Sequence, residues 1–273
     1  MNEKHRASLI QLAPVLASIL FGIICAVLIS STFSTEPYTV TPFSEGIGSL
    51  WNAMYFVIAV SIGATIIYLL LKRKDLRLIT LLIGFALTIA TFMLSFVYLF
   101  AAFSILALPY PEVSVLALSI VTTIIADVAI FRNHKRAGNL TVLCLGGALG
   151  TFLGWSIPLL SAVLILIFLA VYDVYAVFYG PVGKIAQSGL DKLHGLSFSF
   201  KDVQMGLGDL TFYSMLTSRV LISAGPVFCL ASATGVLIGA FLAFKMLEKK
   251  GIFPGLPFPI ALGLVPLIIS LLL

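Results

Sequence analysis

Residues 159–179, LLSAVLILIFLAVYDVYAVFY, form an almost unbroken apolar stretch with one acidic residue, Asp173, inside it. A helix needs about 20 mainly apolar residues to cross the hydrocarbon core of a bilayer. The stretch therefore predicts a membrane-spanning helix. An ionised carboxylate is costly in hydrocarbon, so Asp173 needs a partner, a proton or water at that depth.

Similar apolar stretches fill most of the 273-residue chain, which is 60% hydrophobic and only 10% charged, with a mean hydropathy of +1.15. A soluble domain carries roughly a quarter charged residues, so this composition excludes a soluble globular, disordered or DNA-binding protein. We predict an all-α, polytopic membrane protein that forms one transmembrane domain over residues 1–273. The nine expected helices are 9–31, 49–71, 78–103, 114–131, 140–156, 159–179, 203–218, 220–244 and 254–273, with a loop at about 180–202 between the sixth and the seventh.

The basic residues predict the orientation of these helices, because cytoplasmic loops of membrane proteins are enriched in Lys and Arg. With nine spans, fifteen of the sixteen basic residues fall on one side, and only Arg219 falls on the other. This asymmetry favours an odd number of spans, a cytoplasmic N-terminus and a C-terminus outside. The net charge of +5 thus reports topology and does not indicate a nucleic-acid partner.

Small residues at helical spacing occur in the fifth and eighth expected helices. They are Gly146, Gly150 and Gly154, and Gly235, Gly239 and Ala243. Such residues let helix backbones approach closely in lipid, so we interpret them as packing positions. The three cysteines also lie in apolar stretches, which indicates buried side chains without a disulfide framework; they are Cys25, Cys144 and Cys229.

Three acidic residues fall inside apolar sequence: Asp127, Asp173 and Asp209. No expected span has a Lys or Arg in its interior that could pair with them. Asp173 lies six residues before the end of its span and Asp209 six residues after the start of the next, so both lie roughly 9 Å below the cytoplasmic edge. Consecutive spans are usually neighbours, and we therefore expect these two aspartates to face each other. Asp127 lies at a similar depth, and depth alone does not exclude it.

Two carboxyl groups a few ångströms apart share one proton, because both cannot ionise cheaply. One then acts as a base and the other as an acid. The base takes a proton from water, the water attacks a peptide carbonyl, and the acid protonates the departing nitrogen. This chemistry needs no metal and no cofactor.

Two local features favour a catalytic use of the pair. Gly206 and Gly208 flank Leu207 just before Asp209, and they remove bulk where a substrate backbone could approach. The ninth span opens with Pro254, Gly255, Leu256 and Pro257, and the prolines favour extended or broken helix geometry, which is tolerated at membrane depth only around a cavity or a buried site.

These motifs, in this order, resemble the presenilin and signal peptide peptidase family of intramembrane aspartyl proteases. The family carries Tyr-Asp in its sixth span, Gly-x-Gly-Asp in its seventh and Pro-Ala-Leu-Pro at the start of its ninth. Here Tyr172-Asp173 and Gly206-Leu207-Gly208-Asp209 match the first two motifs, and the third departs only in Gly255, where alanine is usual. The resemblance covers the whole chain and implies a presenilin-like fold of nine helices.

The resemblance implies that Asp173 and Asp209 are the catalytic pair, and which of them starts as the base stays open. It also implies that the substrate contacts the glycine motif and the proline motif. These substrate-binding residues are Gly206, Leu207, Gly208, Pro254, Gly255, Leu256 and Pro257. Tyr172 and Tyr213 lie near the pair and are possible supporting residues, with packing as the alternative. Asp127 lies outside the motifs and is interpreted as a structural or water-facing residue.

The cytoplasmic N-terminus favours the presenilin branch of the family, which implies single-pass membrane proteins as substrates and the lipid bilayer as the medium. The short chain and the short 181–201 loop resemble an archaeal type of homologue in the cell membrane. Self-cleavage, accessory subunits and homo-oligomers stay open.

An ion-coupled secondary transporter is the alternative, because acidic residues at membrane depth and proline-broken helices also mark ion paths. Zinc and serine intramembrane proteases do not fit this sequence. The three histidines, His5, His134 and His194, fall in cytoplasmic segments, so no span supplies a set of metal ligands or a serine–histidine pair.

Overall fold

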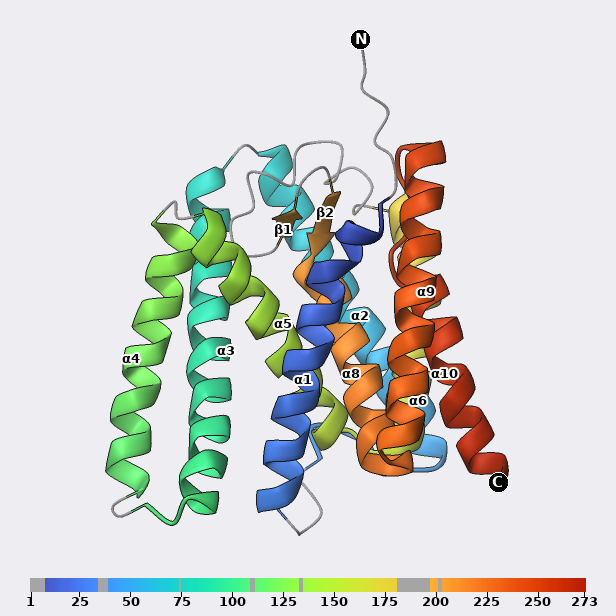
Figure 1. The fold of residues 1–273 in the computed structure, drawn as a ribbon. Coiled ribbons are helices and arrows are strands. Elements are labelled where there is room, and N and C mark those ends of the chain that lie inside the picture. Colours follow the sequence, from blue (N-terminus) through green and yellow to red (C-terminus); the bar gives the residue numbers. More distant parts are fainter. Residues whose placement is uncertain are drawn as a thin grey trace.

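The computed structural model describes residues 8–33, 39–73, 75–108, 111–132, 135–180, 197–200 and 203–273. Helices dominate these residues and run mostly along one axis (Figure 1). A short 3-10 helix, η1 (Leu9–Leu12), precedes the α-helices, which are α1 (Ala13–Thr32), α2 (Ile47–Lys72), α3 (Leu76–Ile105), α4 (Pro111–Phe131), α5 (Lys135–Ser156), α6 (Leu159–Phe178), α8 (Leu207–Ala224), α9 (Pro226–Lys250) and α10 (Pro257–Leu272).

Seven of the described helices are long and apolar enough to cross a membrane, as expected for a multi-pass membrane protein. The predicted count of nine is not reached by this criterion, because α8 and α10 do not meet it. These two helices correspond to the seventh and ninth expected spans. The 16 residues of α10 cover only about 24 Å, and α8 is interrupted by polar side chains, among them Thr211, Ser214, Thr217 and Ser218.

The expected boundary between the seventh and eighth spans was wrong by several residues. The eighth span was predicted at 220–244, whereas α8 continues to Ala224 and α9 begins at Pro226. Gly225 lies between them with φ 86°, a backbone conformation that breaks a helix and that glycine adopts readily. Proline is favoured at the first position of a helix, so Pro226 starts the next one.

A pair of strands at one end of the bundle is the second departure from the prediction. β1 (Ser197–Phe200) and β2 (Val203–Gly206) pair antiparallel, with Ser197 opposite Gly206 and Phe200 opposite Val203 (Figure 1). The seventh span was expected to begin as a helix at 203, but the chain is extended there and α8 begins at Leu207. Most of the loop expected at 180–202 lies outside the described residues.

The polar helix α8 is surrounded by other helices, which explains how it is accommodated. It contacts α1, α5, α6, α9 and α10 (Figure 1). Its contact with α5 is very close, because a Cβ added at Gly150 would collide with the Thr211 carbonyl oxygen, and one at Gly154 would lie 2.7 Å from the Met215 carbonyl oxygen. The predicted packing role of the glycines in α5 is thereby confirmed.

The same principle joins α9 to α10. A Cβ added at Gly235 would lie 2.6 Å from the Leu262 carbonyl oxygen, and one at Gly239 would lie 2.5 Å from the backbone of Pro259. The start of α10 is therefore held against α9 by direct backbone contact. This contact fixes the position of residues 254–257. The first three of these residues immediately precede α10, and Pro257 is its first residue.

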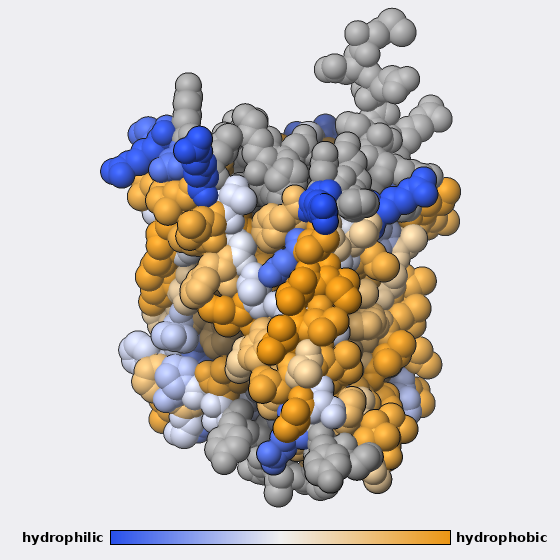
Figure 2. All heavy atoms as spheres, turned by 90° about the vertical axis from the view of Figure 1, so that its left-hand side faces the viewer, coloured by the Kyte–Doolittle hydropathy of each residue, from blue (hydrophilic) through white to orange (hydrophobic). Residues whose placement is uncertain are grey.

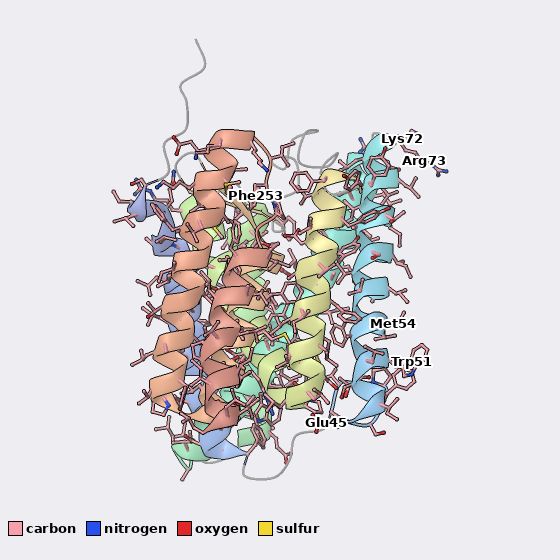
Figure 3. The ribbon with its side chains drawn as sticks, turned by 90° about the vertical axis from the view of Figure 1, so that its right-hand side faces the viewer. Glu45, Trp51, Met54, Lys72, Arg73 and Phe253 are labelled. Atoms are coloured by element: carbon pink, nitrogen blue, oxygen red, sulfur yellow. The ribbon has the colours of Figure 1, made fainter. Side chains whose placement is uncertain are left out.

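The outer surface matches a lipid environment. Figure 2 shows a wide band of hydrophobic residues on one side of the molecule, with hydrophilic residues concentrated along its upper edge. On α2, large apolar side chains such as Trp51 and Met54 point outward, whereas Lys72 and Arg73 lie near one end of the molecule and Glu45 near the other (Figure 3).

Candidate active site

Asp173 lies on α6, five residues before that helix ends at Phe178. Its carboxylate oxygen Oδ2 accepts a hydrogen bond of 3.0 Å from the backbone N–H of Leu256. The side chain is half-buried, so part of its surface remains accessible. The last turns of α6 thus present Asp173 to the segment that leads into α10.

Asp209 lies in the first turn of α8 and is also half-buried. Its carboxyl group lies directly over Gly255, because a Cβ added there would be 2.8 Å from Oδ2 and 3.1 Å from Oδ1 of Asp209. A side chain at position 255 would therefore require the Asp209 carboxyl group to shift. A helix N-terminus also carries partial positive charge, which favours an acidic residue there.

The two predicted aspartates therefore come together, since they reach the adjacent residues Gly255 and Leu256 from different helices. Two half-buried carboxyl groups in this arrangement can share a proton and can hold a water between them.

Of the two tyrosines considered from the sequence, the structure connects only Tyr213 to this site. Its hydroxyl donates a hydrogen bond of 2.8 Å to the carbonyl oxygen of Gly255, and its ring is only 2% exposed. Tyr172 is half-buried on α6, and among the described residues no hydrogen bond joins its side chain to either aspartate or to Gly255.

The segment 254–257 is anchored on both sides of its central glycine. Pro254 and Leu256 are buried, and Pro257 starts α10. Just before the segment, the Phe253 ring stacks on Phe258 at 5.5 Å and meets the ring of Phe178, at the end of α6, edge-on at 6.5 Å. No pattern in the sequence singles out these aromatic residues, because only the folded chain brings residue 178 next to residue 253.

The glycine motif before Asp209 divides into two kinds of position. Gly208 is exposed, and a Cβ added there would have only ordinary contact with the Phe212 ring at 3.8 Å; one added at Gly206 would be 3.9 Å from Asp209. Among the described residues, neither position is tightly packed. Leu207 instead buries its side chain among hydrophobic residues of the core, 3.4 Å from where a Cβ on Gly146 of α5 would lie.

Asp127, the third intramembrane aspartate, is separate from this cluster. It lies on α4, and its Oδ2 accepts a hydrogen bond of 2.8 Å from the hydroxyl of Thr88 on α3. Its other oxygen, Oδ1, is buried and has no hydrogen-bond partner among the residues that the structure describes. The structure thus joins Asp127 to the interface of α3 and α4.

Comparison with known proteins gives a result at the level of structure only. No family model matches this sequence, and no curated protein sequence matches it. Several solved structures are similar, and two of them are of a presenilin family intramembrane aspartate protease. The structure in space group C222 has a TM-score of 0.69 and 17% identity, over 97% of this chain and 98% of that chain. The structure in space group P2 has a TM-score of 0.68 and 18% identity, over 96% and 97%. The chain therefore has the fold of these presenilin-family structures over nearly its whole length.

Proposed function

We propose that this chain is an intramembrane aspartyl endopeptidase, which hydrolyses peptide bonds within or near the transmembrane helices of single-pass membrane proteins. The observation that carries the proposal is the convergence of Asp173 and Asp209 on Gly255 and Leu256 from two different helices. The fold shared with presenilin-family proteases supports it.

In the proposed reaction, the two carboxyl groups hold one proton between them and bind the attacking water. The ionised carboxyl group removes a proton from this water as its oxygen bonds to the peptide carbonyl carbon. The protonated carboxyl group then gives its proton to the nitrogen as the C–N bond breaks. The proton taken from water replaces the one donated, so the pair is restored, and no cofactor takes part.

Substrate reaches the pair as an extended chain in this proposal. A transmembrane helix buries its own backbone hydrogen bonds, so it must unwind before a peptide bond can meet the carboxyl groups. The hairpin of β1 and β2 leads directly into the helix that carries Asp209. Because a two-stranded sheet has unpaired edges, a substrate strand can add to it and satisfy its exposed backbone groups. The loose packing at Gly206 and Gly208 leaves room for that strand.

The proposed topology places both aspartates toward the cytoplasmic side. In this topology all nine described α-helices cross the membrane, the N-terminus is cytoplasmic and the C-terminus is outside. The lysine and arginine distribution supports this orientation. The proposed location is the cell membrane of an archaeal-type organism, with single-pass substrates that are cut near the cytoplasmic face.

The proposal is tested with the purified chain in liposomes that contain a single-span peptide, with products identified by mass spectrometry. We expect cleavage by the native chain and none by Asp173→Ala or Asp209→Ala, whereas Asp127→Ala continues to cleave. Cleavage by either of the first two variants contradicts the proposed pair. A proton flux across the same vesicles without any cleavage would instead identify the alternative, an ion-coupled transporter.

A further inference from the structure

We infer that Tyr213 is a positioning residue, which sets the peptide group between Gly255 and Leu256 so that its N–H points at Asp173. The inference rests on the proposed proteolytic function and assigns a device that aligns one of its two carboxyl groups. It follows from two hydrogen bonds that meet on a single peptide group.

The carbonyl oxygen of Gly255 and the N–H of Leu256 belong to the same planar unit. The oxygen accepts from the Tyr213 hydroxyl at 2.8 Å, and the N–H donates to Asp173 Oδ2 at 3.0 Å. In a trans peptide the two groups point in opposite directions, so the unit bridges α8 on one side and α6 on the other. A change in the orientation of this peptide plane therefore changes the hydrogen bond to Asp173.

Gly255 is the joint at which this plane can rotate. The rings of Pro254 and Pro257 fix their own φ angles. Leu256 is held as the N-cap of α10, where its carbonyl oxygen accepts a hydrogen bond of 3.0 Å from the Ile260 N–H. Gly255 has no such restriction because it lacks a side chain, and an added Cβ would lie 2.8 Å from Asp209 Oδ2. Something outside the segment must therefore hold the plane, and the Tyr213 hydroxyl is the described group that does so.

Tyr213 is well suited to this role because it cannot move easily itself. Its ring is 2% exposed within the main hydrophobic cluster, among residues that include Leu210 and Leu256. The hydroxyl is carried one turn beyond Asp209 on the same helix. Hydrogen bonds in a chain also polarise one another, so the bond from Tyr213 strengthens the N–H of Leu256 as a donor.

The test compares Tyr213→Phe with Tyr98→Phe. Tyr98, on α3, has the same type of bond, from its hydroxyl to the carbonyl oxygen of Ala148 at 2.8 Å, but it lies outside the site. We expect Tyr213→Phe to lower kcat about tenfold, the effect of one lost hydrogen bond, with KM changed less than about twofold. Tyr98→Phe keeps kcat at the native value. Equal kcat values in the two variants would overturn the inference.

A second measurement does not depend on cleavage. In the protein labelled with nitrogen-15 in lipid nanodiscs, the amide proton of Leu256 should resonate downfield because it donates to a carboxylate. Tyr213→Phe and Asp173→Asn should each move it upfield, and Tyr98→Phe should not. An unchanged Leu256 resonance in Tyr213→Phe overturns the inference. If the native chain cleaves nothing, the proposed function fails, and this resonance alone decides whether Tyr213 sets the peptide.

If Tyr213→Phe does not fold, 3-fluorotyrosine at position 213 replaces it in the same measurement. Its hydroxyl is a stronger donor in a ring of nearly the same size, so the Leu256 amide proton should move further downfield. No movement overturns the inference.

Discussion

The molecule contains two settings in which a carboxyl group lies within the helical bundle, and only one of them assembles a site. Asp127 meets one hydroxyl, that of Thr88, where α3 and α4 pack side by side. Asp173 and Asp209 meet each other through a third element, the segment that leads into α10. The first arrangement satisfies one oxygen of a single carboxylate, and the second brings two carboxylates together.

The difference shows that an acidic residue at membrane depth does not by itself form a cluster with a second carboxyl group. All three aspartates lie in apolar sequence, and all three were expected at similar depth. What distinguishes the pair is a non-helical segment with free backbone groups. Proline and glycine break the start of α10, and the released N–H of Leu256 becomes a donor to Asp173.

The largest expected effect separates the two settings directly. Asp209→Asn keeps the size of the side chain but removes the acid and the base, so the rate of cleavage should fall by about 10² to 10⁴. Asp127→Asn should change the rate less than about twofold, because its neighbour is a structural hydroxyl. Initial rates on the same peptide, at matched amounts of folded protein, measure both. Equal losses would place Asp127 in the site.

The next effect concerns the contact between Asp209 and Gly255. In Gly255→Ala the new methyl group would lie 2.8 Å from Asp209 Oδ2, so the carboxyl group must move. We expect a loss in kcat of about tenfold or more, since small misplacement of a reacting group is costly.

Gly63→Ala on α2 is the matched control, because a Cβ there has nothing within 4 Å. It should cleave at the native rate. If Gly255→Ala also cleaves at the native rate, the close contact between Gly255 and Asp209 has no role in the reaction.

A third prediction concerns the support behind Asp209. Gly150→Ala places a methyl group against the Thr211 carbonyl oxygen on α8, so α5 and α8 must separate. Overpacking of this kind costs about 1–3 kcal/mol. The melting temperature in detergent should fall in this variant and not in Gly63→Ala. An unchanged melting temperature would show that α5 and α8 are not packed this closely.

The smallest effect belongs to the Asp127 setting. Thr88→Val removes the hydroxyl that donates to Asp127 while it keeps the shape of the side chain. We expect a loss of stability of about 1 kcal/mol, and no loss of cleavage. Chemical unfolding of the purified protein, together with the peptide assay, measures both quantities. A fall in cleavage larger than the loss of folded protein would connect α3 and α4 to the reaction.

Much of this architecture could be predicted from hydropathy, because a bilayer imposes a length and a composition on each helix. The six helices before residue 180 fall where the apolar stretches lie. The glycines at four-residue spacing in α5 also predict a closely packed helix, but they do not identify α8 as its partner. The pairing of Asp173 with Asp209 follows from their depth on consecutive spans.

Other features depend on contacts that periodicity does not encode. The strand at 203–206 is apolar enough to be read as the start of a helix, and only its pairing with 197–200 reveals it. The polar content of α8 is tolerated because five helices surround it. The bond from Tyr213 to Gly255 joins positions 42 residues apart, and no local pattern predicts it.

The central claim is tested most directly by an experimental structure of the chain in a lipid nanodisc, with the Asp173 and Asp209 side chains and nearby water resolved. The account predicts that one water lies within hydrogen-bond reach, about 2.6–3.2 Å, of both carboxyl groups, while the Leu256 N–H points at Asp173. Carboxyl groups that face lipid, or that lie on helices which do not share a water, would contradict it.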